Sequence, residues 1–283
     1  METRELRYFV AVAEELHFGR AAQRLMISQP PLSRAIQQLE RRLGVILLDR
    51  GARTIALTEA GSVLLHEARV ALEAVEAAER RTRHAAASPF RVRLATKAGA
   101  AKELLSRLLD SYAADPSAAA IEVLLCGPGE PENLLRSGRA DVALLQLPYD
   151  LTAGLETEEL HTEQQVLVLP AAHPLASRGQ LSITEVRTIP GLPLPRWPGP
   201  DGSYPEGAGP QVRDFTQLIQ LIMLGRACAL LPESLGTTLG DDYAVLPVPD
   251  AAAVITVMAW PAHSKSRAVA DLVSAALRLF SGS

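Results

Sequence analysis

The chain has 283 residues, about twice the usual length of one domain, so two or three folding units are expected. With 48% hydrophobic residues, 21% charged residues and two cysteines, it is neither a disordered, a collagen-like nor a disulfide-framed chain. No run approaches the roughly 18 apolar residues that cross a bilayer, and the first residues lack the pattern of a secretory signal. We therefore expect a cytoplasmic protein with no membrane partner.

Basic charge is concentrated at the front of the chain. Residues 1–87 carry 13 Arg, no Lys and 11 acidic residues, whereas residues 88–283 carry 15 basic and 21 acidic residues. This asymmetry indicates a polyanion as partner of the front segment, although uneven charge is also common on ordinary solvated surfaces.

Three helices are predicted in the first 44 residues. The first follows Thr3 as a possible N-cap, and the second covers residues 18–25. The third follows Ser28 as N-cap, accepts two prolines in its first turn, and ends at Gly44. The apolar residues predicted to face inward on this third helix are Leu32, Ile36, Leu39 and Leu43.

The opposite face of the third predicted helix is polar. Arg can clamp guanine, Gln can pair with adenine, and Ser or a backbone N–H can hold a phosphate, so this face suits the major groove of DNA. The alternative is an ordinary amphipathic surface helix, which displays the same residue types. The candidate DNA-contacting residues on this face are Gln29, Pro30, Ser33, Arg34 and Gln37.

Residues 45–58 contain two apolar runs around a Gly-containing turn, a pattern that predicts a β-hairpin. A hairpin after a recognition helix acts as a wing, whose side chains reach phosphates or the minor groove. The candidates on this wing are Arg50, Arg53 and Thr54.

These segments carry a resemblance to a known family. They resemble the DNA-binding domain of the LysR-type transcriptional regulators, near-continuously over about 60 residues. The resembling stretches are Leu6 to Glu15, Arg20 to Ala22, Ser28 to Arg34, Leu39-Glu40, Leu43-Gly44, Asp49-Arg50 and Leu57 to Gly61. Departures from the family pattern are His17 at the N-cap of the second helix, Leu48 for a common Phe, and Gly51, Ala52 and Ala56 in a less basic wing.

A long helix is predicted from residue 59 to about residue 84, with Thr58 as its cap. Its narrow apolar seam favours pairing with a second copy, while the alternative is a helix that lies on its own domain. The resemblance implies a dimerising linker helix, and a tetramer once effector domains also pair. The seam consists of Leu64, Ala68, Ala71, Val75, Ala78 and Thr82, and a hinge is expected at residues 85–89.

From Phe90 onward, predicted strands alternate with helices. Strands are expected at 90–95, 121–126 and 142–147, and helices at 101–112 and 130–137. Two such crossovers imply a parallel sheet, with ligands at the carboxyl ends of its strands. The loops 96–100 and 127–129 each lead into a helix N-terminus, which favours an anion.

The second half of this part predicts another α/β unit. It contains a strand at 165–169, a helix at 215–224, strands at 228–231 and 254–260, and a closing helix at 267–280. Between them, the segment 190–210 holds seven Pro and five Gly residues, which is typical of a rigid surface loop or a lid. Residues 134–141, 172–176 and 224–234 resemble the periplasmic-binding-protein-like effector domain of the same regulators.

The predicted fold class is therefore α/β: an N-terminal winged helix-turn-helix, a long linker helix and a C-terminal two-lobed periplasmic-binding-protein-like α/β effector domain. The predicted domains are 1–58, 59–88 and 89–283, with lobe I at about 89–162 and 264–283 and lobe II at about 163–263.

An effector site is expected between the two lobes. Helix N-termini, one ammonium group and an apolar wall suit a small organic acid, with aromatic acids among the candidates. The alternative for the ammonium group of Lys97 is that it points into solvent. The candidate effector-binding residues are Thr96, Lys97, Ala98, Gly127, Pro128, Gly129, Phe215 and Thr216.

Catalytic motifs are absent from the sequence. The six His residues show no metal-ligand spacing, and there is neither a Gly-x-Ser-x-Gly elbow nor a phosphate-binding Gly-x-x-x-x-Gly-Lys loop. We expect no catalytic residue, metal or cofactor, and we expect Cys126 and Cys228 to be buried, inert thiols. The favoured function is a sequence-specific regulator of promoter DNA that responds to a small molecule. The alternative is a solute-binding or enzymatic α/β domain with an accessory helical front end.

Overall fold

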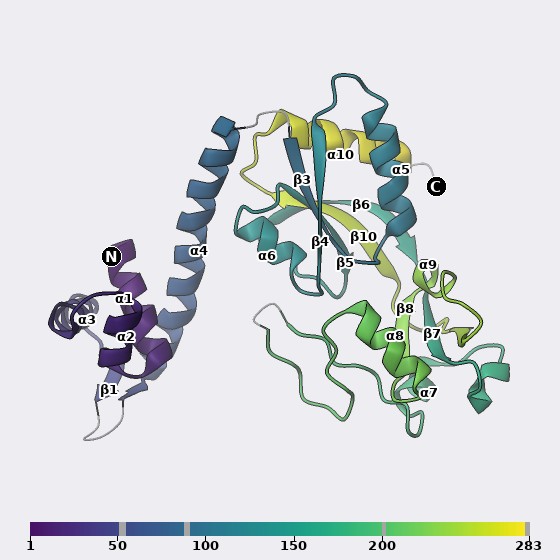
Figure 1. Ribbon diagram of the computed structural model, residues 1–283, viewed down its shortest axis with the longest axis horizontal. Coiled ribbons are helices and arrows are strands. Elements are labelled where there is room, and N and C mark those ends of the chain that lie inside the picture. The colour runs from purple at the N-terminus through teal and green to yellow at the C-terminus, as the bar shows by residue number, and fades with distance from the viewer. Residues whose placement is uncertain (51–54, 88–90, 200–201, 281–283) are drawn as a thin grey trace. The chain divides into compact units, whose positions relative to one another are not determined.

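The computed structural model describes residues 1–50, 55–87, 91–199 and 202–280. The chain divides into two compact units, Met1–Thr82 and Arg83–Ser283 (Figure 1). No helix among the described residues is long and apolar enough to cross a membrane.

The first unit is a three-helix domain followed by a hairpin and a long helix. Its elements are α1 (Thr3–Glu15), α2 (Phe18–Arg24), α3 (Gln29–Leu43), β1 (Leu48–Arg50), β2 (Ile55–Leu57) and α4 (Glu59–Ala87). The antiparallel pairing of β1 with β2 agrees with the predicted hairpin. The first helix begins at Thr3 itself, because Glu2 holds the N-cap position and donates its N–H to the Glu5 carboxylate at 2.7 Å.

The core of this unit is built from the inward faces predicted for its helices. Phe9, Leu32, Ile36 and Leu39 are fully buried. The prediction is wrong for Leu43, which is 41% exposed because it is the last residue of α3, before the chain turns away at the left-handed Gly44.

The entry to α4 requires a glycine. Thr58 caps the helix by accepting the N–H of Gly61 on its hydroxyl at 3.0 Å. A Cβ atom at Gly61 would lie 2.1 Å from the carbonyl oxygen of Leu47, so only glycine allows α4 to pass this close to the hairpin. The glycine that ends the Leu57 to Gly61 stretch is thus required by the close approach of the α4 backbone to the backbone at Leu47.

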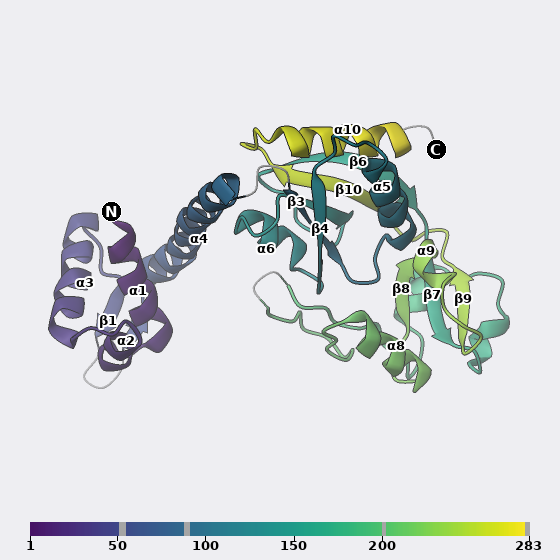
Figure 2. The same ribbon diagram turned by 45° about the horizontal axis from the view of Figure 1, so that its top comes forward.

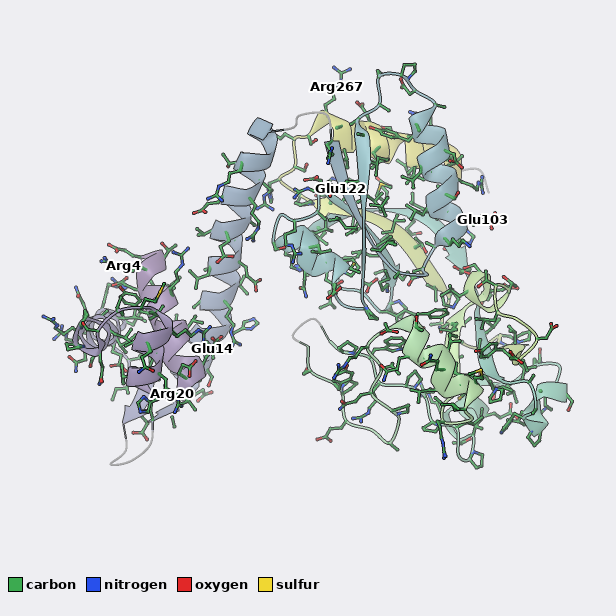
Figure 3. The ribbon with its side chains drawn as sticks, viewed as in Figure 1. Arg4, Glu14, Arg20, Glu103, Glu122 and Arg267 are labelled. Atoms are coloured by element: carbon green, nitrogen blue, oxygen red, sulfur yellow. The ribbon has the colours of Figure 1, made fainter. Side chains whose placement is uncertain are left out.

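The first part of α4 packs on its own domain. Leu64 contacts the core of the first unit, and Ala68 is buried. Arg69 also bonds Glu14, which in turn pairs with Arg24 of α2, both at 2.7 Å (Figure 3). The predicted seam therefore does not serve pairing along its whole length, because its first two members are already covered within the chain.

Lobe I of the second unit is a five-stranded sheet in the order β4-β3-β5-β10-β6. Strands β3, β4 and β5 are parallel, as predicted, whereas β10 runs antiparallel to β5 and β6. The elements of this lobe are β3 (Arg91–Lys97), α5 (Lys102–Ala113), β4 (Ala120–Cys126), α6 (Pro131–Arg136), β5 (Val142–Leu147), β6 (Leu155–Glu163), β10 (Val254–Pro261) and α10 (Arg267–Phe280).

The position of β10 corrects the predicted boundary of the lobes. The chain re-enters lobe I before Val254 and not near residue 263, because β10 is a central strand of the first sheet. Helices α5 and α10 cover one face of this sheet and α6 covers the other, as Figures 1 and 2 both show.

Lobe II is built on a three-stranded antiparallel sheet in the order β8-β7-β9. Its 3-10 helix η1 and α7 pack on one face, while α8 and α9 pack on the other. Its elements are β7 (Gln165–Pro170), η1 (Pro174–Ser177), α7 (Ile183–Arg187), α8 (Phe215–Met223), β8 (Ala229–Pro232), α9 (Glu233–Gly236) and β9 (Tyr243–Pro247).

The two arms of the Pro/Gly-rich segment are held together by Arg196. Its backbone bonds Pro210 and Val212, and its guanidinium donates to the carbonyl oxygens of Gly209 at 2.6 Å and Pro205 at 3.0 Å. The segment is therefore an ordered loop in its described residues, and it contributes Trp197 and its neighbours to a cavity wall.

Candidate DNA-binding and effector-binding sites

The polar face of α3 is available to a partner. Gln29, Pro30, Arg34 and Gln37 are exposed, and Ser33 is half-buried. Within the described residues, the guanidinium of Arg34 makes one long bond, 3.4 Å, to the carbonyl oxygen of Pro30 on the preceding turn. The side chains of this face can therefore exchange water for base edges or phosphates without first breaking strong internal bonds.

Helix α3 is fixed from its inner and its C-terminal sides. Three apolar side chains anchor it in the core, and Arg42 forms two bonds of 2.8 and 3.0 Å to the carboxylate of Glu5 on α1. This bond from Arg42 lowers the pKa of Glu5 below its usual value. The orientation of the polar face thus follows from packing with α1. Of the wing candidates, the side chain of Arg50 and residues Arg53 and Thr54 lie outside what the structure describes.

A cavity of about 720 Å³ lies between the lobes of the second unit. Its size fits a small organic ligand. Its wall contains six of the eight predicted effector residues, together with the loop around Trp197 and the 146–150 turn. The predicted residues on the wall are Lys97, Ala98, Gly127, Pro128, Gly129 and Phe215.

Two predicted residues do not border the cavity. Thr96 is buried within the first sheet, because its side chain points away from the end of β3, and its hydroxyl has no hydrogen-bond partner among the described residues. Thr216 is exposed on α8, one position beyond the Phe215 ring that does face the cavity. Neighbouring residues on a strand or helix point in different directions, and the sequence argument had not separated them.

The Lys97 ammonium on the cavity wall is paired within the protein. It bonds the carboxylate of Asp150 at 2.8 and 3.1 Å, with 13% and 2% of the two side chains exposed. Asp150 also accepts the backbone N–H of Gln146 at 2.6 Å. The alternative that Lys97 points into solvent is therefore wrong: Lys97 borders the cavity, and its ammonium is held in an internal ion pair.

The sequence analysis missed the turn that follows β5. Gln146, Tyr149 and Asp150 border the cavity, and Tyr149 donates its hydroxyl to Gln165 at the start of lobe II at 2.5 Å. A signal was available: β5 is the third parallel strand, so its carboxyl end lies at the same edge as the loops after β3 and β4. Glu132 and Trp197 had no comparable signal.

Burial controls the ionisation of groups on the cavity wall. It raises the pKa of Glu132, whose side chain is 1% exposed, and it raises the pKa of the Cys126 thiol to about 11, with Glu130 adding to the shift. Cys126 is only half-buried, contrary to the expectation for this residue, whereas Cys228 is fully buried. No cluster of metal-ligating side chains occurs among the residues that the structure describes.

The fold and these two sites define a class of protein: a winged-helix DNA-binding domain joined by a long helix to a two-lobed ligand-binding domain. Residues 3–62 match the family described as bacterial regulatory helix-turn-helix protein, lysR family, and residues 90–281 match the LysR substrate binding domain. The chain therefore belongs to the LysR family of transcriptional regulators.

Individual relatives agree with this assignment. The HTH-type transcriptional regulator AlsR of Bacillus subtilis is 36% identical over 204 residues, which cover 70% of this chain and 66% of AlsR. BudR of Raoultella terrigena is 30% identical over 95% of this chain and 98% of BudR. Among solved structures, full-length CbnR complexed with its target DNA has a TM-score of 0.59 and 25% identity, and covers 98% of this chain and 99% of that chain. The chain thus spans slightly less than two thirds of AlsR and nearly all of BudR.

Proposed function

We propose that this protein binds a specific promoter site in double-stranded DNA through α3, and that a small-molecule effector in the cavity between the lobes controls its activity. The exposed polar face on a firmly packed α3 carries the first half of this proposal. The cavity bordered by both lobes supports the second half. The protein acts on DNA in the cytoplasm as a regulator and not as an enzyme.

The DNA contact is tested at Arg34. If its guanidinium reads a base edge, Arg34→Ala weakens specific binding by about 1–3 kcal/mol and relaxes the preference at one base pair. Arg53→Ala serves as the comparison, because a wing contact to phosphate weakens binding to all sequences alike and reduces its salt dependence. Gel-shift titrations on operator and random DNA separate the two. Equal losses on both DNAs for Arg34→Ala would contradict base reading.

We also propose that two copies pair through α4, and that pairing of effector domains then gives a tetramer. Val63 and Val70 are 61% and 54% exposed and lie seven residues apart, hence on one face of α4. A charge on this face should separate the copies, so Val70→Glu should sediment as a monomer with weak operator binding. Val70→Ala, which shortens the side chain without adding charge, should remain associated. A wild-type chain that is monomeric at micromolar concentration would refute the pairing.

The effector is proposed to occupy the cavity and to act by favouring one arrangement of the lobes. Tyr149 is placed to report occupancy, because it borders the cavity and bonds Gln165, whose amide donates in turn to the carbonyl oxygen of Ala252 at 2.6 Å. An effector should therefore alter DNA binding in the wild type and less so in Tyr149→Phe, which keeps the ring but removes this bond. Gel shifts with and without effector measure the difference.

A further inference from the structure

Three of the groups expected to hold an anionic effector already bond carboxylates or a carbonyl oxygen of the protein itself. Lys97 is paired with the nearly inaccessible Asp150. The N–H of Gly127 donates to the carboxylate of Glu130 at 2.6 Å, and the N–H of Ala98 bonds the carbonyl oxygen of Cys126 at 2.9 Å. A carboxylate that bound to these three groups would have to displace one of these internal bonds before it gained its own.

Two other polar atoms on the cavity wall lack partners. Oε2 of Glu132 and Nε2 of Gln146 are both buried and without a hydrogen bond among the described residues. The two side chains are 1% and 7% exposed, and both border the cavity. One atom accepts a hydrogen bond and the other donates one. Because an unpaired buried polar group is costly, a ligand that satisfies either atom gains affinity from it.

The charge on the cavity wall also disfavours an anion. Its charged residues, within the described parts of the chain, are Lys97, Glu132, Asp150 and Asp214, which are one ammonium and three carboxyl groups. Since Asp150 already balances Lys97, Glu132 and Asp214 leave the wall acidic, and Asp214 does so by itself. An anion in the cavity would therefore meet net repulsion from the wall.

Much of the rest of the wall is apolar. Trp197 and Phe215 supply aromatic rings, and α9 and β8 add aliphatic side chains. The segment around Trp197 also touches lobe I closely, since a Cβ atom at Gly129 would lie 3.4 Å from the carbonyl oxygens of Pro198 and Gly199. The wall thus combines flat apolar surfaces with the unpaired polar atoms of Glu132 and Gln146. The aliphatic members are Leu230, Leu231 and Leu235.

We infer that the effector is a largely apolar, ring-containing molecule whose polar end is a neutral donor–acceptor group of the carboxamide type, and not a carboxylate. The donor of this group bonds Glu132 and its acceptor bonds Gln146. This inference rests on the proposed function, because it assumes that the cavity between the lobes is the effector site.

The test uses matched pairs of probes on the full-length chain. Benzamide and benzoate, naphthalene-2-carboxamide and 2-naphthoate, and biphenyl-4-carboxamide and biphenyl-4-carboxylate differ within each pair only in the polar end. Calorimetry and thermal shift should show binding of at least one carboxamide, with about tenfold or greater preference over its carboxylate. A preference for the carboxylates, or no response to any carboxamide, overturns the inference.

Variants then identify the partner atoms. Glu132→Gln keeps the shape of the side chain but exchanges an acceptor for a donor, so it should weaken the carboxamide about tenfold and strengthen the matched carboxylate. Glu103→Gln is the matched control, because Glu103 is exposed on α5 (Figure 3) and does not border the cavity. Gln146→Leu is the second variant and should weaken the carboxamide without strengthening the carboxylate. Unchanged preference in both cavity variants overturns the assignment of the two atoms.

DNA binding without probe is measured in the same samples. If the chain binds operator DNA specifically but prefers the carboxylate probes, only the inferred ligand class is refuted. Loss of specific binding in the wild-type chain would instead refute the proposed function.

Discussion

The polar face of α3 and the cavity between the lobes use polar side chains in opposite ways. On α3, the candidate residues belong to one helix, and water satisfies them until a partner arrives. In the cavity, the polar groups come from separate strands and turns, and its one ammonium group among the described residues is bonded to a carboxylate of the same wall, as Lys97 and Asp150 show. The comparison indicates that the DNA site offers many replaceable contacts, whereas the cavity leaves only a few groups to select its ligand.

The largest expected effect concerns the ion pair in the cavity wall. Lys97→Met leaves Asp150 buried and unpaired, which should lower the free energy of unfolding of the second unit by about 3 kcal/mol. Both tryptophans, Trp197 and Trp260, lie in this unit, so urea unfolding followed by their fluorescence reports on it alone.

The double variant Lys97→Met with Asp150→Asn is the control for this prediction. It removes both charges and should recover most of the lost stability. A loss below about 1 kcal/mol in the single variant would show that the pair is effectively solvated and that the two sites differ less than their geometry indicates.

The next effect concerns the first unit. Gly61→Ala places a Cβ against the carbonyl oxygen of Leu47, and should destabilise the hairpin and the start of α4 by about 1–3 kcal/mol. Hydrogen exchange of amides in residues 47–61 measures this loss. Gly179→Ala is the matched control, since nothing lies within 4 Å of its added Cβ and it belongs to the second unit. Equal protection in the Gly61 variant and the wild type would contradict the close approach.

Acid should affect the two units with opposite sign. Burial of Glu14 would raise its pKa, but the bonds from Arg69 and Arg24 outweigh this effect and lower the pKa. The stability that Glu14 contributes to the first unit is therefore fully present above the ordinary Glu pKa near 4.3, and it is lost as pH falls through the pKa of Glu14 in the folded state. The pKa of Glu132 is raised by burial, so the stability of the second unit rises as pH falls through its folded value toward 4.3.

Variants separate these pH effects. Glu14→Gln should cost the first unit about 0.5–1 kcal/mol at pH 7 and little at pH 3. Glu132→Gln should flatten the pH dependence of the tryptophan-detected unfolding above pH 4.3, because the group that takes up the proton is gone. The prediction would be wrong if the wild-type second unit were less stable at pH 5 than at pH 7 and Glu132→Gln abolished this difference.

The smallest effect is expected at Cys126. Its pKa of about 11 keeps the thiol protonated at neutral pH, so alkylation by iodoacetamide should be slow at pH 8 and accelerate toward pH 11. Cys126→Ser should leave DNA binding without probe unchanged. Rapid alkylation at pH 7 would contradict this prediction, because it would indicate a reactive thiolate at the cavity wall.

Local patterns predicted the first unit well. Helical spacing placed Leu32, Ile36 and Leu39 in the core and Arg34 on the open face, because one helix fixes which of its own residues share a side. The same reasoning was wrong at Leu43, where the helix ends, and at Leu64, which the domain's own core covers. Sequence spacing identifies an apolar face but does not determine which surface packs against it.

By itself, the sequence determined the three helices and the hairpin of the first unit, the parallel strands of lobe I and the loops after β3 and β4 that reach the cavity. It did not predict β6, α7, α9 or β9. Only the tertiary structure decided which groups meet at the cavity. Asp150 lies 53 residues from Lys97 in the chain, and the pair forms because two strands of one sheet end at the same edge. It also decided that β10 returns to lobe I and that Glu132 and Gln146 remain unpaired. Such pairings depend on packing between distant segments, whereas periodicity in a sequence reports only on neighbours along one element.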